Sequence, residues 1–264
     1  MASQTQTMVT LPSGEQQYYK NNELHRVDGP AIIGSNYTEW FQHGQLHRLD
    51  GPASIIVDIR TRKFIERRWF QNGKLHRVDG PAIITESKQE WYQDGQLHRL
   101  DGPAVELSDG TKMWFVNNEK HREDGPAEID CFGVEQWYQH DNLHRLDGPA
   151  VTYPDGSEEW YVDGYRHRIN GPAVIMNGKE KWYINGTKIN TEIVSNYCQT
   201  TISGKDCSIC ISDIDGECYK TSCNHYFHIE CFTELLKRHN KCPNCRYQIK
   251  QDEESDDEFD DEEF

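Results

Sequence analysis

The chain has 264 residues, only 35% of them hydrophobic, and a formal net charge of −16 at pH 7. This hydrophobic share is small for one large globular core and favours a repetitive fold that stays half exposed. The acidic balance argues against a nucleic-acid-binding face, which needs clustered Lys and Arg.

The N-terminus and the cysteines indicate the compartment. The first ten residues, MASQTQTMVT, hold neither a basic nor an apolar segment, so we expect no signal peptide. No apolar run approaches the ~18 residues of a membrane span. Seven of the nine cysteines fall within 207–245 among paired histidines. That pattern indicates metal binding in a reducing compartment, so we expect a cytoplasmic protein.

Residues 1–190 carry an internal repeat with a 23-residue period. The string LHRLDGPA stands at 46–53, 97–104 and 143–150, and LHRVDGPA stands at 24–31 and 75–82. Seven histidines mark the period, with one insertion: His25, His47, His76, His98, His121, His144 and His167. All seven tryptophans keep the same phase, and Tyr18 takes their place in the first repeat: Trp40, Trp69, Trp91, Trp114, Trp137, Trp160 and Trp182.

The repeat EWYQDGQLHRLDGPAVEL, at 90–107, predicts a β-hairpin. Trp91 and Tyr92 fall on opposite faces of a strand. Asp94-Gly95 suits a two-residue turn, whose second position is Gly, Asn or Asp in every repeat and tolerates a left-handed backbone. Gly-Pro marks a bend, and Ala-Val-Glu-Leu alternates as a second strand. We therefore expect a long antiparallel meander with its tryptophans stacked along one face.

The aromatic slot, the Asn-Gly turn and the 23-residue period over about 18–190 resemble MORN-type repeats. The MORN pattern usually has Gly after His where this chain has Arg, so phospholipid binding, sometimes proposed for that family, does not carry over. Six copies of His-Arg-x-Asp, and a seventh string with Asn170 in place of Asp, favour a scaffold over an active site, which is needed only once. We expect Arg and Asp, two positions apart on one strand face, to pair along the array. The alternative is a ligand-binding ladder or a row of metal sites.

The insertion VDIRTRKFIERRWF, at 57–70, lengthens one hairpin and is basic in an acidic protein. A solvated, longer hairpin is the simpler interpretation, because surface loops tolerate insertions. A partner-docking point is the alternative, and the acidic C-terminal segment of the chain is one candidate for it.

The cysteine block predicts two zinc sites. Its spacing is Cys207-x2-Cys210-x12-Cys223-x-His225-x2-His228-x2-Cys231-x10-Cys242-x2-Cys245. Eight such ligands in four close pairs suit two tetrahedral Zn²⁺ ions. Zinc would supply the folding energy of so small a domain, on the order of 10–16 kcal/mol per structural site in model peptides.

The ligand order resembles a RING finger of the H2 type. The resemblance implies interleaved sites, the first zinc on Cys207, Cys210, His228 and Cys231 and the second on Cys223, His225, Cys242 and Cys245. It also implies contacts with a ubiquitin-conjugating enzyme from Ile209, Leu235, Leu236 and Pro243. Arg246 matches the basic residue that bridges the conjugating enzyme and ubiquitin. Leu235 departs from the family, which usually has Trp there, and so offers a smaller apolar contact.

The expected fold is mainly β, in four parts: a MORN-like hairpin array of about eight repeats at 1–190, a linker at 191–206, a small zinc-stabilised α+β RING-H2 domain at 207–246, and a disordered acidic tail at 247–264. Arrays joined to such a RING resemble RING-finger proteins of giant DNA viruses, which implies action in host cytoplasm. The function expected is an E3 ubiquitin ligase without a covalent catalytic residue, whose repeats recruit a protein substrate. A non-catalytic zinc-stabilised scaffold is the alternative, and a lipid-binding array is disfavoured by the acidic charge.

Overall fold

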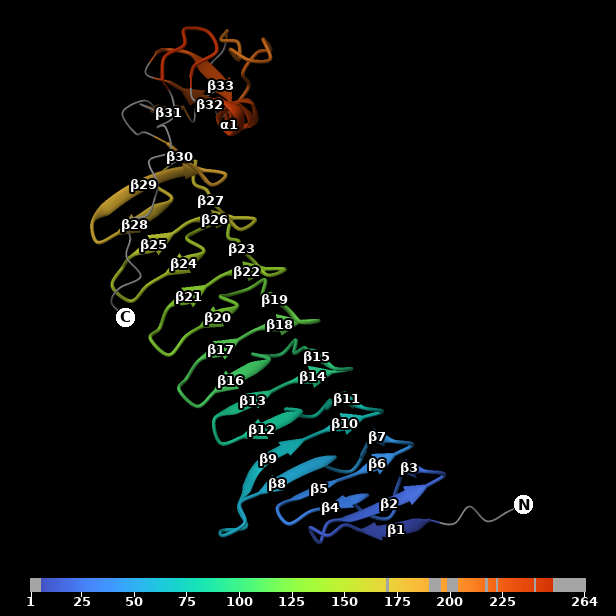
Figure 1. Cartoon of the computed structure of the whole chain (residues 1–264). Helices are drawn as coiled ribbons and strands as arrows, with labels where there is room; N and C mark the ends of the chain where they lie inside the picture. Colours follow the sequence, from blue (N-terminus) through green and yellow to red (C-terminus); the bar gives the residue numbers. More distant parts are fainter. Residues whose placement is uncertain are drawn as a thin grey trace. The chain divides into compact units, whose positions relative to one another are not determined.

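The computed structural model describes residues 6–169, 171–189, 196–198, 204–216, 218–221, 223–239 and 241–248 (Figure 1). The acidic tail beyond residue 248 and most of the expected linker lie outside these residues. The chain divides into two compact parts, residues 1–141 and 142–264, called here the N-terminal and C-terminal parts. In the described chain, no helix combines the length and the apolar character needed to cross a bilayer.

The N-terminal part is built from β-strands. Those of its main sheet are β1 (Thr7–Thr10), β2 (Gln16–Lys20), β3 (Glu23–Leu24), β4 (Ile32–Ile33), β5 (Tyr37–Glu39), β8 (Ser54–Val57), β9 (Phe64–Arg68), β12 (Ile83–Thr85), β13 (Lys88–Glu90), β16 (Val105–Leu107), β17 (Lys112–Met113), β20 (Glu128–Ile129) and β21 (Glu135–Gln136). Beside it lie the shorter strands β6 (Phe41–Gln42), β7 (Gln45–Leu46), β10 (Phe70–Gln71), β11 (Lys74–Leu75), β14 (Tyr92–Gln93), β15 (Gln96–Leu97), β18 (Phe115–Val116), β19 (Glu119–Lys120) and β22 (Tyr138–Gln139).

The C-terminal part continues the strand pattern and adds one helix. Its strands are β23 (Asn142–Leu143), β24 (Val151–Thr152), β25 (Glu158–Glu159), β26 (Tyr161–Val162), β27 (Tyr165–Arg166), β28 (Val174–Met176), β29 (Lys179–Ile184), β30 (Thr187–Ile189), β31 (Asn196–Cys198), β32 (Cys218–Lys220) and β33 (Tyr226–His228). The helix is α1 (Ile229–Arg238).

Each repeat places two strands in the sheet and one short hairpin beside it. In the N-terminal part β12 pairs with β13 through Ile83 and Glu90, β13 with β16 through Glu90 and Val105, and β16 with β17. All of these pairings are antiparallel. The register is that of a meander and is compatible with the expected hairpin array.

The short hairpins turn through two residues that both have positive φ. Asp94 and Gly95 have φ of 51° and 85°, and Asn117 and Asn118 have φ of 53° and 70°. Two consecutive left-handed residues are the signature of a type I′ turn, whose twist matches the right-handed twist of the strands. The requirement explains why Asn, Asp, His and Gly fill these positions.

The alanine that ends each Asp-Gly-Pro-Ala string of the N-terminal part is completely buried. Ala31, Ala53, Ala82, Ala104 and Ala127 are all 0% exposed in the N-terminal part. The Ala104 carbonyl also accepts a hydrogen bond of 2.8 Å from the N–H of Trp91. A side chain larger than a methyl group would therefore have to displace packed neighbours.

Arginine and aspartate do pair in the six repeats that have both, but in a loop rather than on a strand face. Arg99 Nε donates to Asp101 Oδ1 at 2.9 Å, and Arg99 Nη1 donates to the Pro103 carbonyl at 3.1 Å. The same guanidinium lies 4.1 Å from the ring centre of Trp91, a cation–π geometry. A Cβ on Gly102 would come within 2.8 Å of it. The string thus fixes one arginine between an aromatic ring and a glycine.

The histidine of each string links one repeat to the next. The backbone N–H of His43 donates to His25 Nδ1 at 3.1 Å, and the N–H of Asp94 donates to His76 Nδ1 at 3.1 Å. In both cases the donor lies in the turn of the following hairpin. The invariant histidine is therefore an acceptor for a turn N–H that would otherwise lack a protein partner.

We expect the N-terminal part to lose stability as the pH falls below about 6.5. Burial lowers the pKa of His25 from its ordinary value of 6.5; the charges of His43 and Lys20 act in the same direction and Glu23 opposes them. The unfolded chain therefore binds a proton that the folded chain resists, so stability is full above pH 6.5 and declines below it. Urea unfolding at pH 7.5 and pH 5.0 should show a smaller decline for His25→Gln, and an equal decline would contradict this role.

The basic insertion forms the long hairpin β8–β9. Asp58 Oδ1 accepts the N–H groups of Arg60 and Thr61 and so shapes the turn. Ile59 and Phe64 near its end are 60% and 61% exposed. The insertion therefore lengthens two neighbouring strands without breaking the order of the sheet, as its simpler interpretation predicts.

Candidate metal centre

A small core holds together the region that carries the paired cysteines and histidines. Tyr219 on β32, Phe227 on β33 and Phe232 on α1 are buried, with ring centres 4.8 Å apart for Tyr219–Phe232 and 5.2 Å apart for Phe227–Phe232. Leu236, one turn further along α1, is 1% exposed. Ile214 is buried in the same core. Five large side chains make a core too small to stabilise a domain of this size alone.

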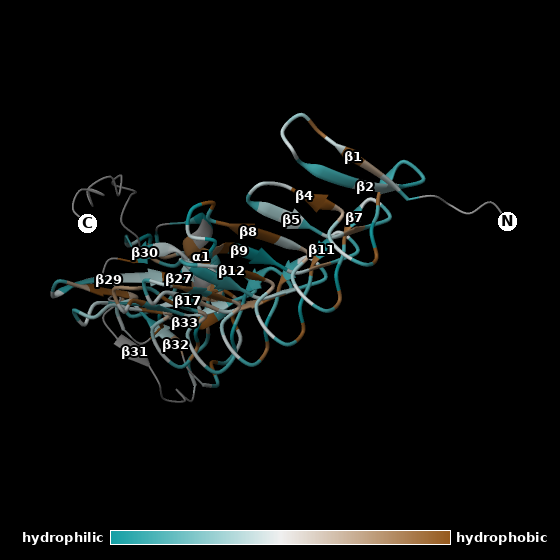
Figure 2. Ribbon diagram, turned by 90° about the horizontal axis from the view of Figure 1, so that it is seen from below, coloured by the Kyte–Doolittle hydropathy of each residue, from teal (hydrophilic) through white to brown (hydrophobic). Residues whose placement is uncertain are grey.

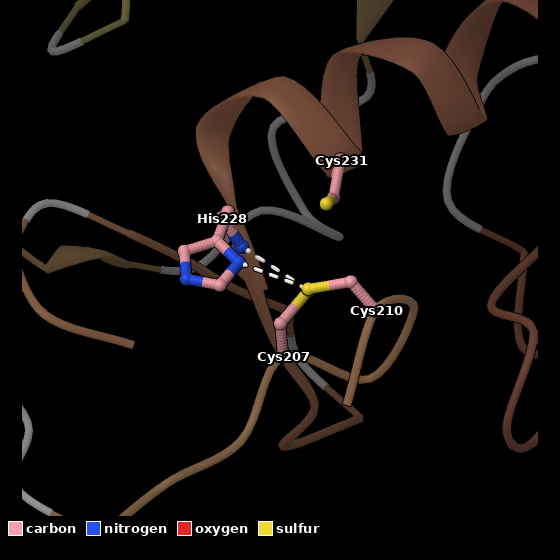
Figure 3. A group of neighbouring side chains, drawn as sticks. All are labelled: Cys207, Cys210, His228 and Cys231. Atoms are coloured by element: carbon pink, nitrogen blue, oxygen red, sulfur yellow. Dashed lines mark hydrogen bonds between the residues drawn. The ribbon is translucent and has the colours of Figure 1, made fainter. Parts of the chain in front are cut away.

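The first cluster joins a turn, a strand end and a helix start. Cys207, Cys210, His228 and Cys231 present ligand atoms that all lie within 4.8 Å of one another. Figure 3 shows the four side chains converging, with His228 between the loop and the helix. His228 Nδ1 lies 3.3 Å from Cys210 Sγ.

Backbone geometry brings Cys207 and Cys210 to the same point. The N–H of Ile211 donates to the Cys207 carbonyl at 2.9 Å, and Ile211 has a φ of 59°. This closes a tight turn whose two cysteines point the same way. A β-branched residue at positive φ is strained, which indicates that the turn is held by its surroundings.

The orientation of His228 is fixed from outside the cluster. Its Nε2 lies 3.1 Å from the carbonyl oxygen of Asp213. Since a carbonyl can only accept, Nε2 carries the proton and Nδ1 keeps a free lone pair facing the thiols. This is the arrangement that metal-binding histidines use.

The second cluster is built the same way. Cys223, His225, Cys242 and Cys245 also lie with their ligand atoms within 4.8 Å of one another. His225 Nδ1 is 3.4 Å from Cys223 Sγ, 3.5 Å from Cys242 Sγ and 3.7 Å from Cys245 Sγ. A turn closed by the N–H of Arg246 on the Cys242 carbonyl, at 2.8 Å, repeats the first loop.

In the first cluster the thiols differ in how readily they ionise. Hydrogen bonds from the Ser212 hydroxyl and backbone N–H lower the pKa of Cys210 to about 6. Burial, together with the neighbouring thiols of Cys207 and Cys210, raises the pKa of Cys231 to about 12. Cys210 thus ionises more readily than an ordinary thiol, whereas Cys231 needs a nearby cation to offset the cost of its burial.

These donor sets fit Zn²⁺. Each has three sulfurs and one imidazole nitrogen, the composition of a structural tetrahedral site with Zn–S bonds of about 2.3 Å. Each is also compact enough for one ion to reach all four atoms. The region therefore holds two Cys/His clusters that could bind two zinc ions.

Comparison with known proteins identifies this region. Residues 205–246 match the family model described as the Ring finger domain. Residues 205–246 therefore form a RING finger domain. The match does not include the repeats of residues 1–190.

Curated relatives match a short part of the chain. RING-H2 finger protein ATL52 of Arabidopsis thaliana is 42% identical over 48 residues, which are 17% of this chain and 13% of that protein. The E3 ubiquitin-protein ligase Iruka of Drosophila melanogaster is 37% identical over 79 residues, 29% of this chain and 19% of that protein. The E3 ubiquitin-protein ligase SIRP1 of Oryza sativa subsp. japonica is 33% identical over 52 residues, which are 19% of this chain and 16% of that protein. The chain thus spans under a fifth of each relative.

The residues expected to contact a conjugating enzyme differ in exposure. Ile209 is 38% exposed, and Pro243 and Arg246 lie exposed on the second turn. Leu235 is half-buried, whereas Leu236 is 1% exposed and packs in the RING core. Leu236 therefore anchors the helix, and the more accessible leucine is Leu235.

Sequence reasoning missed two supports of the clusters. The Asp213 carbonyl orients His228 as described, and a backbone carbonyl leaves no mark in a sequence. Thr221 is 0% exposed, with its Oγ1 3.0 Å from Cys223 Sγ and 3.3 Å from the N–H of His225. Its place two residues before Cys223 was a usable signal, because a short hydroxyl side chain there can cap the turn.

Proposed function

We propose that the protein is a RING-type E3 ubiquitin ligase whose repeats recruit a protein substrate. The proposal is supported by the RING finger at 205–246, by its two Cys/His clusters and by relatives named E3 ubiquitin-protein ligases. The clusters are proposed to hold the two zinc ions with the ligand sets that the sequence predicts.

The observation that carries the proposal is the surface of the two cysteine turns. One turn presents Ile209 and the other presents Pro243, both accessible, and Arg246 follows the last ligand. A purely structural zinc module has no reason to expose apolar side chains at both turns. A module that docks an apolar loop of a conjugating enzyme does.

The proposed mechanism is orientation rather than covalent chemistry. The conjugating enzyme carries ubiquitin as a thioester, and this domain would hold the two in an attack-ready arrangement. Arg246 has a φ of 63° and its N–H is bound to the Cys242 carbonyl at 2.8 Å, so its backbone is fixed. From this fixed base its guanidinium can donate to both proteins at once.

One departure favours a second candidate, a non-catalytic scaffold. Leu235 is smaller than the Trp usual in RING ligases and is half-buried, so it adds little apolar surface to the contact. In this alternative the RING mediates assembly alone. The two functions differ in whether Ile209 and Arg246 are needed for transfer.

The finer description of the repeats is also a proposal. The aromatic slot, the type I′ turns and the 23-residue period support a MORN-like assignment for residues 1–190. The resemblance to RING-finger proteins of giant DNA viruses supports the host cytoplasm as the place of action.

Self-ubiquitylation of the zinc-loaded protein tests the ligase. Across a panel of conjugating enzymes, we expect chain formation by the wild type and a loss of about tenfold or more in Ile209→Ala and in Arg246→Ala. Zinc content should stay unchanged in both. Arg60→Ala is the matched control, because this exposed arginine lies in the turn between β8 and β9 of the N-terminal part, outside the RING domain. Inactivity of the folded wild type across the panel would favour the scaffold.

A further inference from the structure

One position of the repeated string has no structural role. In His-Arg-x-Asp-Gly-Pro-Ala every other side chain packs or pairs within the array. The variable position x is apolar in most repeats, yet Val27, Leu49, Val78 and Leu100 are 74–80% exposed. Glu123 occupies the same position with its side chain 88% exposed, so the fold does not require an apolar residue there.

The exposed positions form a row along the N-terminal part. Figure 2 shows the loops that follow the short hairpins, near β7 and β11, as a series of parallel arcs. Backbone bonds fix their order: the N–H of Arg48 donates to the Phe70 carbonyl and the N–H of Arg77 to the Tyr92 carbonyl, both at 3.1 Å. Each loop therefore stacks on the following hairpin.

Open cavities lie between consecutive loops. One cavity of about 860 Å³ is lined by Leu100, Asp101, Trp114 and Arg122 among others, and a second of about 520 Å³ by Val78, Asp79, Trp91 and Leu100. Each combines the exposed apolar side chain of one loop with the tryptophan of the next hairpin. Along the row, exposed apolar side chains thus alternate with cavities that a tryptophan ring lines on one side.

The charged groups that this row exposes most are carboxylates, each paired through one oxygen with the arginine of its own loop. Asp50, Asp79 and Asp101 follow the apolar residues and have side chains 84–86% exposed. The arginines that pair with them are only 22–23% exposed, because they lie against the tryptophans. On the outer edge of the row a partner therefore meets carboxylates and apolar tips, whereas guanidinium groups line the cavities between the loops.

The spacing selects a partner conformation. Successive loops are two strands apart, or about 9.6 Å. A polyproline II segment advances about 9.3 Å every three residues and returns the same face each time. A β-strand repeats its face every two residues, about 6.7 Å, and fails to match.

We propose that the loops bearing Val27, Leu49, Val78 and Leu100 form a docking surface for an extended, basic segment of a partner protein in the polyproline II conformation. The segment places an apolar side chain at every third residue and Lys or Arg between. The inference rests on the proposed ligase function only in naming the partner as its substrate.

The probe is a fluorescein-labelled peptide, (Leu-Lys-Pro)6, titrated by fluorescence anisotropy against the full-length zinc-loaded protein. We expect saturable binding. A peptide of the same composition in scrambled order, and one with Glu in place of Lys, should each bind about tenfold more weakly or worse. Equal affinity for the scrambled peptide, or no saturable binding, would overturn the proposal.

Variants locate the surface. Leu49→Ser combined with Leu100→Ser should weaken binding by about tenfold or more, because each leucine buries apolar area only in the complex. Phe132→Ser is the matched control: Phe132 is 80% exposed but lies in the turn between β20 and β21, away from the loops. Unchanged peptide binding by the double variant would refute the site.

The two proposals fail separately. The binding assay contains neither conjugating enzyme nor ubiquitin, so Arg246→Ala should bind the peptide as the wild type does. Loss of chain formation with intact peptide binding would reject the ligase alone. Chain formation without peptide binding would reject the docking surface alone.

Discussion

Removing zinc with a chelator is expected to unfold the RING domain and leave the repeats of the N-terminal part folded. The RING core has five large buried side chains, Ile214, Tyr219, Phe227, Phe232 and Leu236. Each cluster, in contrast, would contribute on the order of 10–16 kcal/mol when loaded. The interleaving of the ligands adds to this effect. His228 and Cys231 of the first cluster lie between Cys223, His225 and Cys242 of the second along the chain, so neither half folds alone.

Metal analysis and hydrogen exchange measure this expectation. The wild type should hold two zinc ions per chain, and chelation should abolish amide protection in β33 and α1 but not in β12 and β13. Cys231→Ser should behave like the chelated protein. Cys131→Ser is the matched control, because Cys131 is an exposed free cysteine of the repeats and should leave both ions bound. Protection of β33 that survives chelation would show that the small core suffices.

Trp91→Ala is expected to lower the free energy of unfolding of the N-terminal part by about 3 kcal/mol, the lower end for a tryptophan because the side chain is half-buried. The substitution removes the ring against which the Arg99 guanidinium lies at 4.1 Å. Arg99 then loses its cation–π partner while its pairing with Asp101 remains. The damage should be local, since repeats contact mainly their neighbours.

Urea unfolding and local hydrogen exchange test that result. Trp91→Tyr is the matched control, since Tyr18 takes the same slot in the first repeat with Arg26 lying 4.1 Å from its ring centre. Trp91→Tyr should lower the free energy of unfolding by about 1 kcal/mol or less. Loss of protection should centre on β12 to β17. If Trp91→Tyr were as damaging as Trp91→Ala, ring volume rather than the arginine contact would decide the stability.

The hairpins were predictable because their determinants are local. A two-residue turn with positive φ at both positions accepts few residue types, so the pair Asp94-Gly95 predicts the turn from the sequence alone. The role of Arg99 was only half predictable. Its pairing with Asp101 follows from spacing, but its packing against Trp91, eight residues earlier, depends on the chain folding back across the hairpin. The acceptor role of His76 toward the turn N–H of Asp94 likewise exists only once two repeats stack.

The two Cys/His clusters were predictable in their residues and less so in their supports. Paired cysteines and histidines carry a spacing that few other structures require, and the structure brings the predicted sets of four together. Which leucine of α1 stays accessible could not be read from the sequence, because Leu235 and Leu236 differ only in the face of the helix they occupy. That face is set by packing on Phe227 and Phe232.

The links between repeats have an evolutionary consequence. Each junction between neighbouring repeats uses the same kind of backbone hydrogen bond and the same histidine-to-turn contact. The side chains of arginine, aspartate and tryptophan contact one another inside a single repeat. Duplicating or deleting one 23-residue segment of the gene would therefore create no new kind of junction. A lineage could therefore change the number of repeats, and with it the length of the proposed docking surface, while keeping the same contacts between repeats.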